Sequence, residues 1–171
     1  AGHTKADILV LGNSRLSTGV RAEWSRQTVS SYDLFTSEQE EPQELTPDSP
    51  IEMLMPAINL TVPTGNDAQL RLGASSTVNR PDLNELSPQQ KYSGTPGAGT
   101  VKGNPLLSIA RIYNGDARWE WYIAEREFLS VGGFYKYFTD PIESFQLNSG
   151  GGETITTFAN IPSAQNIGAE L

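Results

Sequence analysis

Apolar and polar residues alternate along much of this chain, and strict alternation is typical of a β-strand with two different faces. The clearest case runs over residues 58–62 and resumes over residues 68–74, after a turn at 63–67 that contains Pro, Gly and Asn. This pattern predicts an antiparallel hairpin with one buried face. The apolar members expected in the core are Ile58, Leu60, Val62, Leu70 and Leu72.

Aromatic residues concentrate in the second half of the chain, where ten of the fifteen lie between residues 111 and 145. Two more hairpins are predicted there, over residues 107–124 and 128–138, with turns at Asn114-Gly115-Asp116 and Gly132-Gly133. Trp119 and Trp121 share one strand face, because they alternate with charged neighbours. We favour packing of both indole rings in the core over the alternative, in which they join an exposed platform that stacks on sugars.

Three segments interrupt this pattern. Residues 36–50 are acidic and rich in proline, residues 76–105 hold many Pro and Gly residues, and residues 159–171 are small, polar and without period. We expect two exposed loops and a loose C-terminal tail. The remainder gives nine or ten short strands, so the predicted fold is all-β: a single domain over residues 1–171, built as an antiparallel β-sandwich of jelly-roll type.

Charge and composition exclude several function classes. The net charge is -8, and the 12 basic residues are scattered, so neither direct nucleic-acid binding nor adhesion to an anionic membrane surface is expected. There is no cysteine, and His3 is the only histidine. No apolar run approaches the length of a helical membrane span. We expect no metal site and no cofactor.

Candidate catalytic groups are weak. The segment Ile8–Ser14 resembles the first block of SGNH hydrolases, but the block's acidic residue is replaced by Asn13, and the single histidine lies upstream. Carboxylates gather in the aromatic half, where they could serve a glycosidase or form a solvated face, and we favour the solvated face. They are Glu120, Glu125, Glu127, Asp140 and Glu143. The chain is therefore predicted not to be an enzyme.

Three tyrosines remain as candidates for contact with a partner or a sugar: Tyr122, Tyr135 and Tyr137. Aromatic faces on a sheet bind the apolar sides of pyranose rings, and tyrosine adds a polar hydroxyl. This supports one alternative function, a lectin-like carbohydrate-binding module located outside the cell. A third alternative is a carboxylate-dependent glycoside hydrolase on a jelly roll.

The leading hypothesis is a structural assembly protein. In size, strand pattern and acidity, the whole chain resembles the small single jelly-roll major capsid proteins of tailless, membrane-containing icosahedral viruses of bacteria and haloarchaea. That resemblance implies a virion location, self-association into a shell, a second capsid protein as partner and an internal membrane beneath the shell.

Overall fold

The computed structural model describes residues 1–10, 13–25, 27, 29–31, 43–45, 51–88, 90–92, 99–124, 127–149 and 153–171. Most of them lie in β-strands. Seven strands form the main sheet: β1 (Gly2–Val10), β2 (Ser14–Ser25), β5 (Ile51–Pro63), β6 (Ala68–Asn79), β9 (Ala110–Ala124), β10 (Glu127–Thr139) and β13 (Ser163–Glu170). The shorter elements are β3 (Val29–Ser31), β4 (Gln43–Leu45), α1 (Leu83–Leu86), β7 (Gln90–Tyr92), β8 (Thr100–Lys102), β11 (Ile142–Ser149) and β12 (Glu153–Asn160). The all-β prediction is confirmed.

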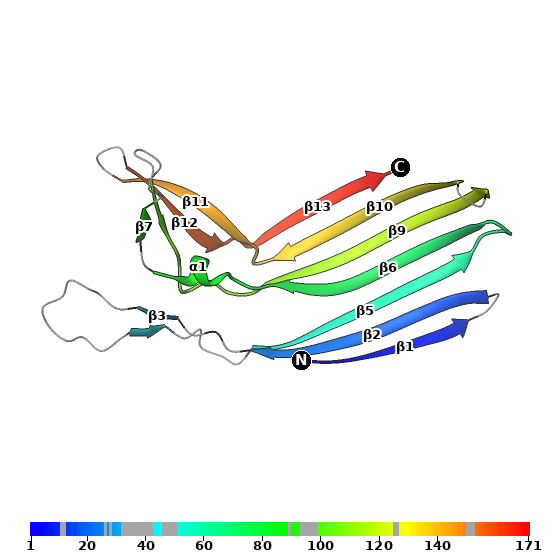
Figure 1. Cartoon of the computed structure of the whole chain (residues 1–171), viewed down its shortest axis with the longest axis horizontal. Helices are drawn as coiled ribbons and strands as arrows, with labels where there is room; N and C mark the ends of the chain where they lie inside the picture. Colours follow the sequence, from blue (N-terminus) through cyan, green and yellow to red (C-terminus); the bar gives the residue numbers. More distant parts are fainter. Residues whose placement is uncertain are drawn as a thin grey trace, which may run out of the picture.

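The main sheet is a simple meander in the order β1-β2-β5-β6-β9-β10-β13, in which every neighbouring pair is antiparallel. Figure 1 shows these strands side by side, with the N-terminal strand β1 at one edge and the C-terminal strand β13 at the other. Among the described residues, neither edge strand has a partner on its outer side. The sheet is therefore open at both edges.

The connections between the long strands differ at the two ends of the sheet. At one end β1–β2, β5–β6 and β9–β10 are joined by the short segments 11–13, 64–67 and 125–126. At the other end the connections are the long segments 26–50, 80–109 and 140–162. All the shorter elements lie in these long segments, so the sheet has a short-turn end and a long-connection end.

Two of the long connections fold together at that end. The parallel pairing of β8 with β12 joins them into a four-stranded sheet of order β11-β12-β8-β7. The side chain of Asn160 links the same two connections, because its Oδ1 accepts from the Ser108 backbone N–H (2.8 Å) and its Nδ2 donates to Ser108 O (3.1 Å). Two of the three buried apolar residues of the described chain, Leu86 and Leu107, lie in this region.

The predicted jelly-roll sandwich is wrong in its arrangement, since a single seven-stranded meander replaces two facing sheets. Two predicted turns also fall inside strands: residues 114–116 lie within β9, and residues 132–133 lie within β10. Alternation continues across both sites, and the chain reverses instead between β9 and β10, where Ala124 pairs with Glu127. Residues 159–171, expected to form a loose tail, are mostly β13, which pairs with β10.

The predicted hairpin over residues 58–74 is confirmed, with Leu60 opposite Leu72. The burial predicted for its apolar residues is not confirmed, because Ile58 is 46% exposed and Leu72 is 40% exposed.

Two segments were predicted to form loops. Segment 76–105 holds the end of β6 together with α1, β7 and β8, while segment 36–50 lies largely outside the described residues. Among the described residues, no helix is both long enough and apolar enough to cross a membrane.

Candidate functional site: a polar sheet face with a charged hollow

The main sheet has one apolar face and one polar face, and the strand register assigns each side chain to its face. Residues directly opposite one another project to the same side of a sheet, while successive residues project to opposite sides. One row across all seven strands is therefore apolar: Ile8, Leu16, Leu60, Leu72, Ala117, Gly133 and Ala169. The next row contains Leu9, Arg15, Thr61, Arg71, Arg118, Gly132 and Glu170.

The apolar face carries no Asp, Glu, Lys or Arg over long stretches of the described strands. These stretches are residues 2–10, 14–24, 54–62, 68–78, 113–123, 129–139 and 163–169. Large side chains on this face are open to the surroundings, among them Trp121 (42% exposed) and Ile167 (80% exposed). An exposed apolar surface of this extent indicates contact with a partner or a membrane.

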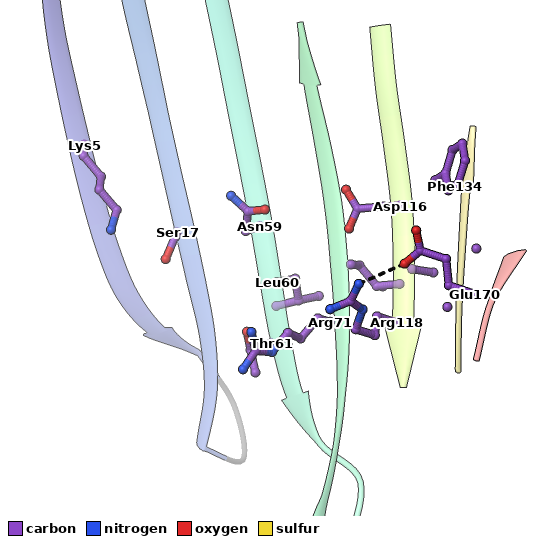
Figure 2. Close-up of a pocket in the computed structure, with 14 residues that line it drawn as sticks. Lys5, Ser17, Asn59, Leu60, Thr61, Arg71, Asp116, Arg118, Phe134 and Glu170 are labelled. Atoms are coloured by element: carbon purple, nitrogen blue, oxygen red, sulfur yellow. Dashed lines mark hydrogen bonds and ion pairs between the residues drawn. The ribbon is translucent and has the colours of Figure 1, made fainter. Parts of the chain in front are cut away.

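The polar face holds a hollow of about 600 Å³. It lies between the row that contains Arg71 and Arg118 and the row that contains Ser17, Asn59 and Asp116. Its lining residues come from every strand of the main sheet. Figure 2 shows them spread across the sheet, from Lys5 on β1 to Phe134 on β10 and Glu170 on β13. The hollow is thus a property of the whole sheet rather than of one loop.

Charges around the hollow are partly paired. Arg118 donates to Glu170 across 3.2 Å, as drawn in Figure 2, although both side chains remain well exposed. Asp7 pairs with Lys5 (3.2 Å) and Arg15 (3.6 Å). Exposed pairs of this kind contribute little stability, roughly 0–1 kcal/mol each. These exposed pairs make the surface around the hollow polar, with both positive and negative groups facing water.

A more buried network lies nearer the short-turn end of the same face. Glu120, only 6% exposed, accepts hydrogen bonds from Gln69 Nε2 (2.6 Å) and Tyr122 Oη (2.8 Å). Arg71 Nε lies 3.3 Å from the same carboxylate. Because the carboxylate is paired and hydrogen-bonded, its burial is tolerated. At the opposite end of the face, Glu23 forms ion pairs with both Arg21 and Arg80.

The three tyrosines singled out in the sequence do not share one surface. Tyr122 belongs to the polar face beside Glu120, whereas Tyr135 and Tyr137 lie on the apolar face. Trp119 and Trp121 share the apolar face as predicted, with ring centroids 6.4 Å apart, but Trp121 is not buried.

The acidic candidates are also dispersed. Glu120 is held in its network, Glu127 begins β10, Asp140 and Glu143 lie beyond the end of β10, and Glu125 is outside the described residues. No group of three or more potential metal ligands occurs within the described ranges.

Sequence reasoning missed the residues that line the hollow, above all Arg71, Asp116, Arg118 and Glu170. Their signal was present in the alternation, since each stands between apolar neighbours of the opposite face. The alternation alone did not identify these residues as a site, because polar residues on one strand face are equally typical of an ordinary solvated surface.

Comparison with known proteins gives a consistent result. The sequence model of the family described as TonB dependent receptor-like, beta-barrel, matches residues 6–171. The comparison with curated proteins gives no match. Among solved structures, the siderophore receptor PirA from Pseudomonas aeruginosa has a TM-score of 0.71 at 16% identity, covering 98% of this chain and 29% of that receptor.

Two further receptors share the fold. A mutant of the ferric enterobactin receptor PfeA from Pseudomonas aeruginosa, in complex with enterobactin, has a TM-score of 0.65 at 18% identity, covering 98% of this chain and 23% of that one. A double mutant of the Serratia marcescens hemophore receptor HasR, in complex with its hemophore HasA and heme, has a TM-score of 0.59 at 11% identity. The match covers 91% of this chain and 27% of that receptor. The chain spans less than a third of the length of each of these receptors.

These findings overturn the capsid hypothesis and what followed from it. A match over residues 6–171 to a receptor β-barrel contradicts a capsid subunit, a virion location, and partnership with a second capsid protein or self-assembly into a shell. It equally contradicts the lectin-like module, its extracellular location and its carbohydrate partner, and the glycoside hydrolase. The resemblance failed because size, strand pattern and acidity are shared by many all-β chains.

Proposed function

Because the chain belongs to the TonB-dependent receptor-like β-barrel family, we propose that it forms part of the transmembrane wall of a bacterial outer-membrane receptor. The observation that carries this proposal is the division of the seven-stranded meander into an apolar face, uncharged over the long stretches given above, and a polar face with a charged hollow. In an outer-membrane barrel, residues facing lipid alternate with residues facing the lumen in this way. The apolar face then meets lipid, and the hollow opens to the lumen.

The unequal connections orient the sheet in the membrane. Bacterial outer-membrane barrels have short periplasmic turns and longer extracellular loops. On this rule the short connections between β1 and β2, between β5 and β6 and between β9 and β10 face the periplasm. The long segments that carry α1 and the four-stranded sheet face the outside of the cell.

Aromatic side chains on the apolar face support the same placement. Trp119 and Trp121 lie toward the short-turn end, while Tyr113 and Tyr137, opposite each other, lie toward the long connections. At ~3.4 Å per residue, Trp121 and Tyr113 are about 27 Å apart along β9. A strand tilt of roughly 40° reduces this to about 20 Å across the membrane, comparable with the ~25 Å apolar band between the aromatic girdles of such barrels.

The open edges of β1 and β13 fit a segment of a larger barrel. Unpaired strand edges in a membrane leave backbone N–H and C=O groups without partners, so spanning sheets must close. Seven strands are too few to enclose a lumen, and outer-membrane transporters of about 22 strands are known. Further strands pair with β1 and β13 in the complete receptor.

The cargo we propose is an iron-loaded siderophore, since one of the receptors compared above is named a siderophore receptor and another a ferric enterobactin receptor. Receptors of this family transport their ligand rather than transform it, which agrees at the level of the family with the prediction that the chain is not an enzyme. The proposed cargo is tested by measuring the uptake of labelled ferric siderophore by cells with and without the receptor. Uptake should depend on the receptor.

The wall assignment is tested by two neighbouring arginine substitutions in the complete receptor. Ile58→Arg places a charge on the lipid-facing side, at a cost of roughly 2–4 kcal/mol near the middle of the bilayer. Asn59→Arg places the same charge in the lumen and is the matched control. We expect the first to reduce strongly the amount of folded barrel in the outer membrane, measured by heat-dependent gel mobility, and the second to leave it nearly unchanged. Equal amounts of both variants would contradict the proposal.

A further inference from the structure

Arg111 is a charged side chain at the margin of the otherwise apolar face. In the register it lies between Val78 of β6 and Thr139 of β10, one row beyond the opposed pair Tyr113 and Tyr137. It is half-buried, and among the described residues it makes no hydrogen bond or ion pair. The other strand arginines, such as Arg71 and Arg118, lie on the polar face and have carboxylate partners.

A guanidinium in this position needs an external partner. Removing a cation from water without a counter-ion is costly, and the surrounding face supplies no carboxylate over residues 68–78, 113–123 and 129–139. A guanidinium presents five N–H donors in a planar fork that matches the oxygens of a phosphate. Tyr113, Tyr137 and Thr139 neighbour Arg111 on the same face in the register, and each carries a hydroxyl that can donate to an anion.

The depth of Arg111 indicates where that anion comes from. Arg111 lies on the long-connection side of the Tyr113–Tyr137 pair, and tyrosines on a lipid-facing surface mark the level of the headgroups. Basic side chains just beyond such a belt extend to the headgroup region. We propose that Arg111, with Tyr113, Tyr137 and Thr139, binds the phosphate group of a phosphorylated lipid in the outer leaflet. This inference rests on the placement of the sheet in the membrane given above.

The test uses the complete receptor in phosphatidylcholine vesicles that contain increasing amounts of diphosphorylated lipid A, with lipid A binding to the receptor as the readout. One basic residue near a membrane surface contributes about 1 kcal/mol, so Arg111→Gln should weaken lipid A binding about fivefold. Arg118→Gln, which removes the same charge from the lumen side, should bind lipid A like the unchanged receptor. Thermal unfolding in phosphatidylcholine alone should be the same for both variants.

Three results would overturn the proposal: unchanged lipid A binding by Arg111→Gln, an equal loss in Arg118→Gln, or displacement of lipid A by millimolar inorganic phosphate. These results are separable from failure of the wall assignment. If the receptor inserts into vesicles but Arg111→Gln binds normally, only the lipid site is wrong. If the receptor does not insert at all, the placement in the membrane is wrong and the lipid site falls with it.

Discussion

Phe134 lies directly opposite Gly168 in the register of β10 and β13, and its ring covers the glycine. A Cβ atom added at Gly168 would lie 2.5 Å from Cζ of Phe134, closer than real Cβ contacts allow. An aromatic ring over a cross-strand glycine shields the backbone and fixes the pairing of the two strands. The pair therefore specifies how the edge strand β13 joins the sheet.

Gly168→Val should weaken the pairing of β13 with β10, because the ring of Phe134 must leave its place. We expect a loss of about 1–3 kcal/mol, as for other overpacked sites, measured by thermal unfolding in detergent micelles. Gly133→Ala is the control, since a Cβ there meets nothing closer than Gly168 O at 3.6 Å. A Gly168→Val receptor as stable as the control would show that the ring does not fix this register.

Glu120→Gln should destabilise the barrel near its short-turn end. The substitution removes the charge that Arg71, Gln69 and Tyr122 share in a nearly buried position, and losing one partner of such a network costs about 1–3 kcal/mol. Glu170→Gln, at an exposed pair with Arg118, should change the unfolding temperature little. Equal shifts for the two variants would contradict a structural role for the Glu120 network.

Asn160→Ala should loosen the long connections without affecting the main sheet. The Asn160 side chain bonds to the backbone of Ser108 and, through Nδ2, to Asp140 O (2.6 Å), so its loss frees groups in both connections. Hydrogen exchange should become faster at residues 104–108 and 140–142 and stay unchanged in β6 and β9. Asn148→Ala, at an exposed position of β11, is the control. Unchanged exchange at residue 108 in the Asn160 variant would refute the link.

The alternation of residues predicted the strands well but not their surroundings. Ile58, Leu60 and Leu72 do share one face, yet the same pattern fits a globular core and a lipid-facing wall, because burial in protein and burial in lipid both select apolar side chains. Trp121 was expected in the core for this reason and is 42% exposed. What separates the two cases is whether a second apolar layer covers that face, and the part of the chain that the structure describes supplies none.

Turn signals misled where strands were unusually long. Asn114, Gly115 and Asp116 are typical hairpin-turn residues, but in β9 Asn114 and Asp116 lie on the polar face and Gly115 on the apolar face. Asn114 Nδ2 donates across the sheet to Thr77 Oγ1 (3.2 Å) instead of closing a turn. The sequence of one long strand with polar residues on its lumen side can therefore be mistaken for two shorter strands joined by a turn. For the same reason, the charged hollow could not be identified from single strands, since its lining is contributed one or two residues at a time.

The central claim, that one face of the sheet meets lipid and the other meets water, is tested most directly by spin-label accessibility along β5. This chain has no cysteine, so single cysteines can be introduced at positions 57–62 of the complete receptor and labelled specifically once any cysteine outside this chain has been replaced. In lipid vesicles, labels at positions 58, 60 and 62 should collide preferentially with oxygen, which concentrates in the bilayer. Labels at positions 57, 59 and 61 should collide preferentially with a water-soluble nickel complex. A period of two between these responses is the predicted result, and uniform accessibility to the nickel complex at all six positions would contradict the account.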